Sequence, residues 1–141
     1  MHVTRQSIRR CCAAICICLE ASLSTTGGIA ASQPPLASSR VLARAEEWFY
    51  RFQSGNIDRS QLDAEMSGEV SASLIRREST ALGPYGRPLS FRYISSGPIR
   101  GTKGYAFLIK FNAGAVLELI AFDESGKIAG IDFETYAPRS A

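Results

Sequence analysis

The chain has 141 residues, 16 basic and 13 acidic side chains, and a formal net charge of +3. A chain of this length forms one domain and a tail, and it lacks the run of ~18 uncharged apolar residues that a membrane-spanning helix requires. Its basic residues are interspersed with acidic ones, whereas nucleic-acid-binding domains concentrate basic side chains on one face. We therefore expect neither a membrane span nor a nucleic-acid partner.

The first thirty residues have the three-part organisation of a secretory signal peptide. Residues 1–10 contain three arginines and no acid, residues 11–19 (CCAAICICL) are apolar, and the residues after Glu20 are mostly small and polar. Gly28 and Ala30 place small side chains where a signal peptidase requires them. We predict cleavage after Ala30 and a periplasmic or secreted protein. The alternative is that residues 1–30 are a mispredicted start or a disordered tail. Glu20 favours this alternative, because a charge directly after the apolar stretch weakens a signal peptide.

Cleavage after Ala30 would remove all four cysteines and the only histidine, His2. The net charge of residues 31–141 would fall to about +1, because three arginines and one glutamate lie in the removed segment. Without cysteine or histidine the mature chain has no disulfide, neither of the commonest metal ligands and no imidazole base for Ser–His–Asp or Cys–His catalysis. We expect no metal and no cofactor, and we favour binding over catalysis.

The helical part of the chain follows a linker over residues 31–39, in which Pro34 and Pro35 disfavour a helix. A helix over 40–53, capped by Ser39, is predicted from a stripe of apolar residues at helical spacing: Val41, Ala45, Trp48, Phe49 and Phe52. We predict a short second helix from a cap at Asp58 to about Glu65, with Gln61 completing a capping box. A third helix is predicted over 68–82, from a cap at Ser67 to the Gly83–Pro84 stop.

The remaining residues are predicted to form four strands, over about 89–93, 105–111, 115–122 and 128–136. Turns are expected at SSGP (95–98) with the glycine-containing loop after it, at 112–114 and at 123–127. Consecutive strands joined by short loops form an antiparallel meander. Helices followed by strands indicate an α+β fold with the N-terminal helices packed on a four-stranded sheet. Residues 137–141 are a tail.

Several of these features together resemble the nuclear transport factor 2-like (cystatin-like) superfamily, and more narrowly small exported bacterial domains of unassigned function. The resemblance covers about residues 40–136. It rests on the Trp48–Phe49 pair, on SGNID (54–58), on a helix that ends in Gly-Pro and on the sequence DxxGKIAG (123–130). It implies a curved sheet wrapped around the helices as a cone, often with a pocket for a small apolar molecule, and frequent dimerisation through the sheet. The catalytic pattern of the isomerases in this superfamily has no match here, so no catalytic residue is carried over.

Six residues are candidates to line such a pocket: Trp48, Phe52, Tyr105, Phe107, Glu118 and Asp132. The aromatic residues are expected to be core residues first. Glu118 interrupts an apolar strand, and a buried carboxylate is costly unless it is paired. We favour an ion pair with Lys110 on the preceding strand over a catalytic role for Glu118. Asp132 alternates with Glu134, which indicates a solvated sheet face more than a proton-transfer base.

Our leading hypothesis is a non-enzymatic exported domain that binds a small apolar ligand or a protein partner through the concave face of its sheet. A homodimeric structural or interaction module is an alternative, because residues 115–122 are apolar on both faces and large apolar patches usually mark contacts. A second alternative is an isomerase- or cyclase-like enzyme that uses Asp132 or Glu118 as its base.

Overall fold

The structure, a computed structural model, describes residues 37–137. The predicted signal peptide, residues 31–36 of the predicted linker and the last four residues of the chain lie outside that range. The helical elements, in chain order, are α1 (Ser39–Ser54), the 3-10 turn η1 (Arg59–Gln61), α2 (Ala64–Glu69), α3 (Ala72–Leu82) and the 3-10 turn η2 (Gly83–Tyr85). The strands are β1 (Ser90–Ile99), β2 (Thr102–Phe111), β3 (Gly114–Phe122) and β4 (Ile128–Tyr136).

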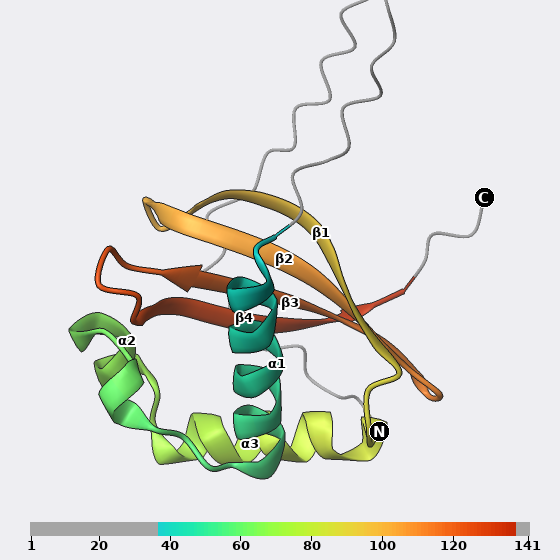
Figure 1. Ribbon diagram of the computed structural model, residues 1–141. Helices are drawn as coiled ribbons and strands as arrows, with labels where there is room; N and C mark the ends of the chain where they lie inside the picture. The colour runs from blue at the N-terminus through green and yellow to red at the C-terminus, as the bar shows by residue number, and fades with distance from the viewer. Residues whose placement is uncertain (1–36, 138–141) are drawn as a thin grey trace, which may run out of the picture. The chain divides into compact units, whose positions relative to one another are not determined.

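The four strands form one antiparallel sheet in the order β1-β2-β3-β4. The sheet is curved, and α1 lies across one of its faces with α2 and α3 beside it (Figure 1). We call the face that α1 covers the inner face and the opposite one the outer face. This arrangement confirms the predicted α+β fold, in which N-terminal helices pack on a curved four-stranded meander. Within residues 37–137, no helix combines the length and the apolar character needed to cross a membrane.

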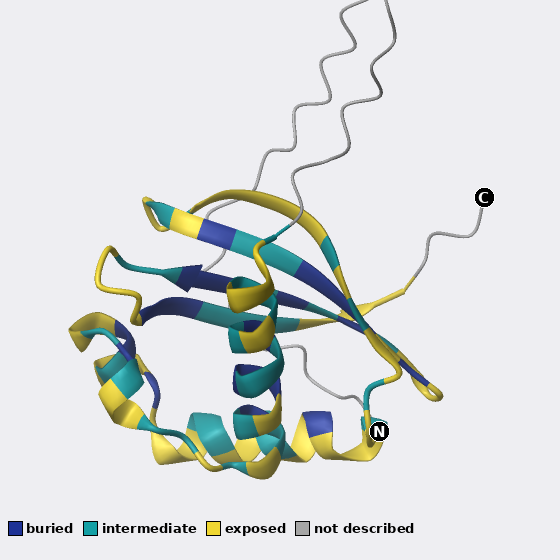
Figure 2. Ribbon diagram, viewed as in Figure 1, coloured by how far each residue is buried: buried dark blue, intermediate teal, exposed yellow. Residues whose placement is uncertain are grey.

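The apolar stripe of α1 determines how the helix packs on the sheet. Ser38 caps the helix by accepting a hydrogen bond from the amide of Val41 at 3.3 Å, one residue before the predicted cap. The helix ends at Gly55, whose φ of 74° is the left-handed conformation that glycine tolerates best. The stripe residues Ala45, Trp48, Phe49 and Phe52 are all buried (Figure 2). Burial of each large apolar side chain contributes about 1.5–3 kcal/mol, so this face holds α1 on the sheet.

The segment between α1 and α3 is divided differently from the prediction. Asp58 does cap a helical turn, since it accepts a hydrogen bond from the amide of Ser60, but that turn ends at Gln61. The Gln61 side chain donates to the Asp58 carboxylate at 3.0 Å and does not complete a capping box. The turn ends because Leu62 pairs with Ile128 in a parallel bridge, which requires an extended backbone.

The same segment is interrupted a second time, between α2 and α3. Asp63 caps α2 and Ser71 caps α3, whereas we predicted one helix that begins at Ser67. Val70 leaves the helical conformation and is buried with 1 % of its surface exposed. Burial of Met66 and Val70 in the core therefore determines where the chain leaves α2 before α3 begins. The serine and acidic residues that signal helix caps in the sequence could not indicate this position.

The strand β1 is longer than predicted because the predicted SSGP turn is wrong. Residues 95–98 continue β1 after an irregularity in pairing between Tyr93 and Ser95. The chain reverses instead at Arg100 and Gly101, whose φ values are 52° and 78°. The order of the strands makes β1 an edge strand, where glycine, proline and an irregularity are tolerated because one side of the strand has no partner.

Small residues beside this turn make room for Ile99. Gly104 pairs with Gly97 on β1 and with Ala121 on β3. A Cβ atom added at Gly104 would lie 2.3 Å from Cδ1 and 2.4 Å from Cγ1 of Ile99, so this side chain fills the space above the glycine. The adjacent Arg100 binds the Glu69 carboxylate of α2 through two nitrogens, at 3.1 Å and 2.6 Å.

We predict that Gly104→Ala destabilises the protein by about 1–3 kcal/mol, because the added methyl group overlaps Ile99. Gly97→Ala is the matched control, since it lies opposite in the same ladder and a Cβ there meets no atom within 4 Å. Urea unfolding of both variants measures the difference. Ile99→Ala should recover part of the loss in the Gly104→Ala background. Equal unfolding free energies for the two glycine variants would show that Ile99 does not occupy this space.

Candidate functional site

Glu118 lies on the inner face of the sheet, beneath the helices. It is directly opposite Phe107 on β2 and Phe133 on β4, so a carboxyl group stands between two aromatic residues in one row across the sheet. The residue is fully buried at 0 % exposure. Neither carboxyl oxygen has a hydrogen-bond partner in the described part of the chain. A buried polar group in this state costs about 1–3 kcal/mol, so Glu118 is the residue that packing alone does not explain.

Burial raises the pKa of Glu118 well above its ordinary value, because the apolar surroundings disfavour the charged form. Electrostatic repulsion from Glu46 on α1 raises the pKa further. Both effects favour the neutral form of the carboxyl group over the ionised form. A neutral carboxyl group has one O–H donor and one free carbonyl acceptor, so Glu118 can both donate a hydrogen bond to a bound group and accept one from it.

The predicted partner of Glu118 was wrong. Lys110 pairs with Ala115 at the far end of the β2–β3 ladder, and Glu118 pairs with Phe107. Lys110 and Glu118 therefore point to opposite faces of the sheet, because successive side chains alternate between faces. The prediction used only the adjacency of the two strands, and the register of the hairpin separates the two side chains.

Four further candidate residues lie on the same side of the sheet as Glu118. Trp48, Phe52 and Phe107 are buried at 0–2 % exposure, and the Trp48 and Phe52 rings are 6.2 Å apart. Phe52 contacts Phe133, the cross-strand neighbour of Glu118, at 5.5 Å. Tyr105 is partly buried on the inner face of β2, with its ring 6.1 Å from Phe122. The structure thus brings Glu118 and an aromatic cluster together between α1 and the sheet.

Asp132, the sixth candidate, is separated from this group. It pairs with Leu119 and so lies on the outer face. Burial raises the pKa of Asp132, a hydrogen bond from the Phe133 amide at 2.9 Å opposes that effect, and repulsion from Glu134 and Glu78 adds to it. Asp132 and Glu118 therefore cannot act on one bound group from opposite ends of a single site. Within residues 37–137, no group of three or more histidine, cysteine or acidic side chains is placed to hold a metal ion.

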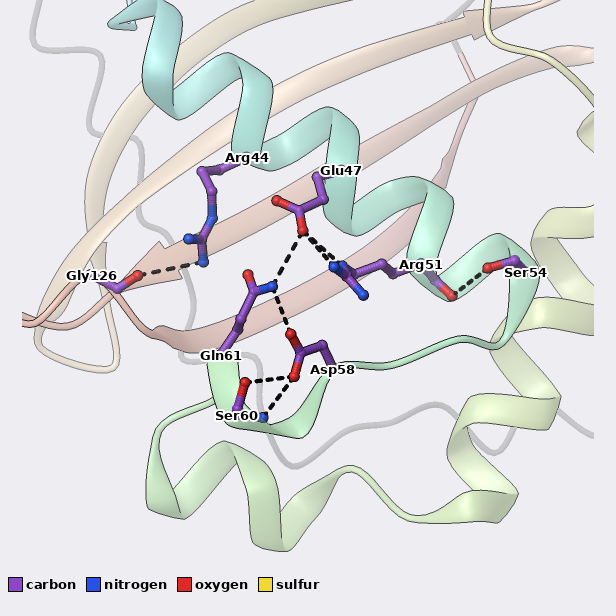
Figure 3. Close-up of polar contacts among 8 residues, drawn as sticks. All are labelled: Arg44, Glu47, Arg51, Ser54, Asp58, Ser60, Gln61 and Gly126. Carbon is purple, nitrogen blue, oxygen red and sulfur yellow. Dashed lines mark hydrogen bonds and ion pairs between the residues drawn. The ribbon is translucent and has the colours of Figure 1, made fainter.

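A polar cluster on one flank of α1 was missed by the sequence analysis. Glu47 accepts hydrogen bonds from Arg51 at 2.8 Å and from Gln61 of η1 at 3.3 Å, and Gln61 also donates to Asp58 (Figure 3). Burial alone would raise the pKa of Glu47, but the hydrogen bonds from Arg51 and Gln61 and the nearby positive charges lower it overall. The i, i+4 spacing of Glu47 and Arg51 was the available signal, and such pairs are common on solvated helices.

Comparisons of the chain with protein-family models, with curated proteins and with solved structures find no match.

We predict that Glu118 makes the stability of the protein fall as the pH rises. The unfolded chain releases the Glu118 proton near the ordinary glutamate pKa, whereas the folded protein retains it. Across the interval between these two pKa values the native state binds more protons, so the free energy of unfolding decreases by about 1.4 kcal/mol per pH unit from this group. Glu118→Gln should remove this contribution, as measured by urea unfolding between pH 5 and pH 8.

The control for this experiment is Glu134→Gln, which removes an exposed glutamate from β4 and leaves Glu118 in place. It should retain the contribution of Glu118 to the pH dependence. The interpretation of Glu118 would be overturned if the Glu118→Gln protein and the wild type lost stability equally over this interval.

Proposed function

We propose that this protein is an exported, non-enzymatic domain that binds a small, largely apolar molecule on the inner face of its sheet. Glu118 would be the polar anchor for that molecule. The observation that carries the proposal is the carboxyl group of Glu118, which is fully buried among aromatic side chains with no hydrogen-bond partner for either oxygen in the described residues.

The energetic cost of Glu118 supports a functional role. Native proteins satisfy the great majority of their buried polar groups, and an apolar side chain of similar size at this position would avoid the cost. A bound molecule with one polar group would satisfy the carboxyl group, and its apolar part would match the rings around Glu118. The ligand class is therefore a small apolar molecule with a single polar group, such as a hydroxyl or a carbonyl.

The same carboxyl group favours the isomerase- or cyclase-like alternative, because general acid–base catalysis uses carboxyl groups with raised pKa values. A catalytic base must be ionised in order to accept a proton. Burial and the charge of Glu46 favour the protonated form of Glu118, which donates a hydrogen bond but does not abstract a proton. Binding is for this reason the better supported role.

The order of the elements agrees with the proposed kinship to the nuclear transport factor 2-like superfamily. Helices precede a curved antiparallel meander, and α1 presents its Trp48–Phe49 pair to the sheet. This supports the kinship as a proposal at the level of architecture. The inner face of the sheet, where the superfamily often has its pocket, is also where Glu118 lies.

The ligand is tested by native mass spectrometry of the purified wild-type protein and of Glu118→Met. We expect a small-molecule adduct on the wild type and none on the variant. The variant should also gain about 1 kcal/mol or more in unfolding free energy, because methionine removes the unsatisfied group at nearly constant volume. Ile120→Met, on the same strand and face, should retain the adduct.

Two results would contradict the binding proposal. An adduct that persists on Glu118→Met would show that the carboxyl group is not the anchor. If the wild-type protein carries no adduct and its mass spectrum shows the charge series of a dimer, the alternative of a homodimeric interaction module would be favoured.

Export is a separate part of the proposal and rests on residues 1–30. When the full-length chain is expressed in a bacterial host, we expect the mature protein to begin at Ala31, as read by N-terminal sequencing of the exported fraction. Ala30→Arg should block this cleavage, because the signal peptidase requires a small residue at that position. Protein that remains inside the cell with its first residues intact would contradict export.

A further inference from the structure

The two partly buried arginines of α1 differ in their partners. Arg51 is bound to the Glu47 carboxylate at 2.8 Å, whereas Arg44 extends toward the turn between β3 and β4 (Figure 3). There its Nη2 donates to the Gly126 carbonyl at 3.5 Å, and its Nε is buried without a hydrogen-bond partner in the described residues. Arg44 forms no ion pair within residues 37–137. A charge that loses water without gaining a partner is costly, so Arg44 is a candidate to hold an anion from outside the chain.

A second cation lies beside the same aromatic ring as Arg44. The Arg44 guanidinium lies over the Phe122 ring at 5.6 Å, and Lys103 on β2 is the residue directly opposite Phe122 in the ladder. The Lys103 ammonium lies over the ring of Tyr105, one of the six pocket candidates, at 5.5 Å. The Tyr105 and Phe122 rings are 6.1 Å apart, so the two cations are joined through two neighbouring rings. Lys103 also has no ion pair in the part of the chain that the structure describes.

This pair of cations is separate from the Glu118 carboxyl group. Phe122 is four residues beyond Glu118 on β3, which is about 13 Å along a strand. The fully buried Ile120 lies between them on the same face. The two rings and Arg44 are partly exposed, and Lys103 is exposed. An anion can therefore reach both cations from solvent without displacing the residues around Glu118.

The acidic residues nearest to the two cations in the chain have other partners. Asp123, the residue after Phe122, accepts hydrogen bonds within its own turn, from the Ser125 hydroxyl at 2.7 Å and from the Lys127 amide at 2.9 Å. Glu47 is held in the polar cluster described above. Neither carboxylate forms an ion pair with the two cations.

We propose that Arg44 and Lys103 form a binding site for the carboxylate of a small organic acid. Guanidinium and ammonium groups both donate charge-assisted hydrogen bonds to carboxylate oxygens. The partly exposed rings of Phe122 and Tyr105 offer apolar contact to the carbon chain of the acid. Inorganic phosphate could use the cations but not the rings, and a neutral alcohol could use the rings but not the cations.

The site is tested by isothermal titration calorimetry of the full-length protein with sodium butyrate. We expect saturable binding of butyrate that is tighter than the binding of either inorganic phosphate or butanol. Arg44→Gln and Lys103→Gln should each weaken butyrate binding about ten-fold or more, which is the effect of losing a hydrogen bond to a charged group. Arg44→Lys keeps the positive charge and should bind more tightly than Arg44→Gln. Circular dichroism checks that each variant is folded.

The matched controls are Arg40→Gln and Lys110→Gln, which remove one exposed positive charge from α1 and from the outer face of β2. Both should bind butyrate as the wild type does. Equal weakening by all four glutamine variants would show a general attraction to positive charge and would overturn the proposal. Heat that does not saturate, or phosphate that binds as tightly as butyrate, would also overturn it. The adduct experiment on Glu118 has a different ligand and a different variant, so either proposal can fail alone.

Discussion

The packing of Phe49 against the inner face of the sheet is the interaction on which the rest of the structure depends. Its ring lies 5.8 Å from Phe91 on β1, 5.5 Å from Phe111 on β2 and 6.0 Å from Phe133 on β4. One side chain of α1 thus contacts rings from three of the four strands. Aromatic pairs at such distances add about 0.5–1.5 kcal/mol each beyond the area they bury, so Phe49 fixes the position of α1 on the sheet.

This packing also explains why Glu118 is so different from the other acidic residues. Because α1 closes the inner face, the carboxyl group is removed from solvent and has no hydrogen-bond partner among residues 37–137. Glu47 and Asp58, in contrast, lie on the flank of α1 and on η1, where hydrogen bonds from Arg51, Gln61 and Ser60 lower their pKa values. The fold therefore places Glu118 inside an aromatic cluster and a separate network of hydrogen-bonded polar side chains beside it.

The sequence was sufficient to predict the class and order of the fold. The helical stripe of α1 and the period-two strands are strong signals, and the ends of β4 were predicted correctly. The breaks at Leu62 and Val70 were not predictable, because they depend on contacts with residues far along the chain. The extension of β1 depends instead on its pairing with residues 102–106 of β2. For the site, the apolar strand around Glu118 indicated burial, but only the register of β2 and β3 shows that Lys110 is on the other face.

The binding proposal requires that the buried carboxyl group of Glu118 be neutral in the folded protein. The most direct measurement is a pH titration of the glutamate side-chain carboxyl carbons by 13C NMR, with Glu118→Gln used to assign the Glu118 signal. We expect this signal to keep the chemical shift of a protonated carboxyl group at neutral pH, after the exposed glutamates have ionised. A Glu118 signal that ionises together with the exposed glutamates would contradict it, because the side chain would then be hydrated or paired and unavailable as the anchor.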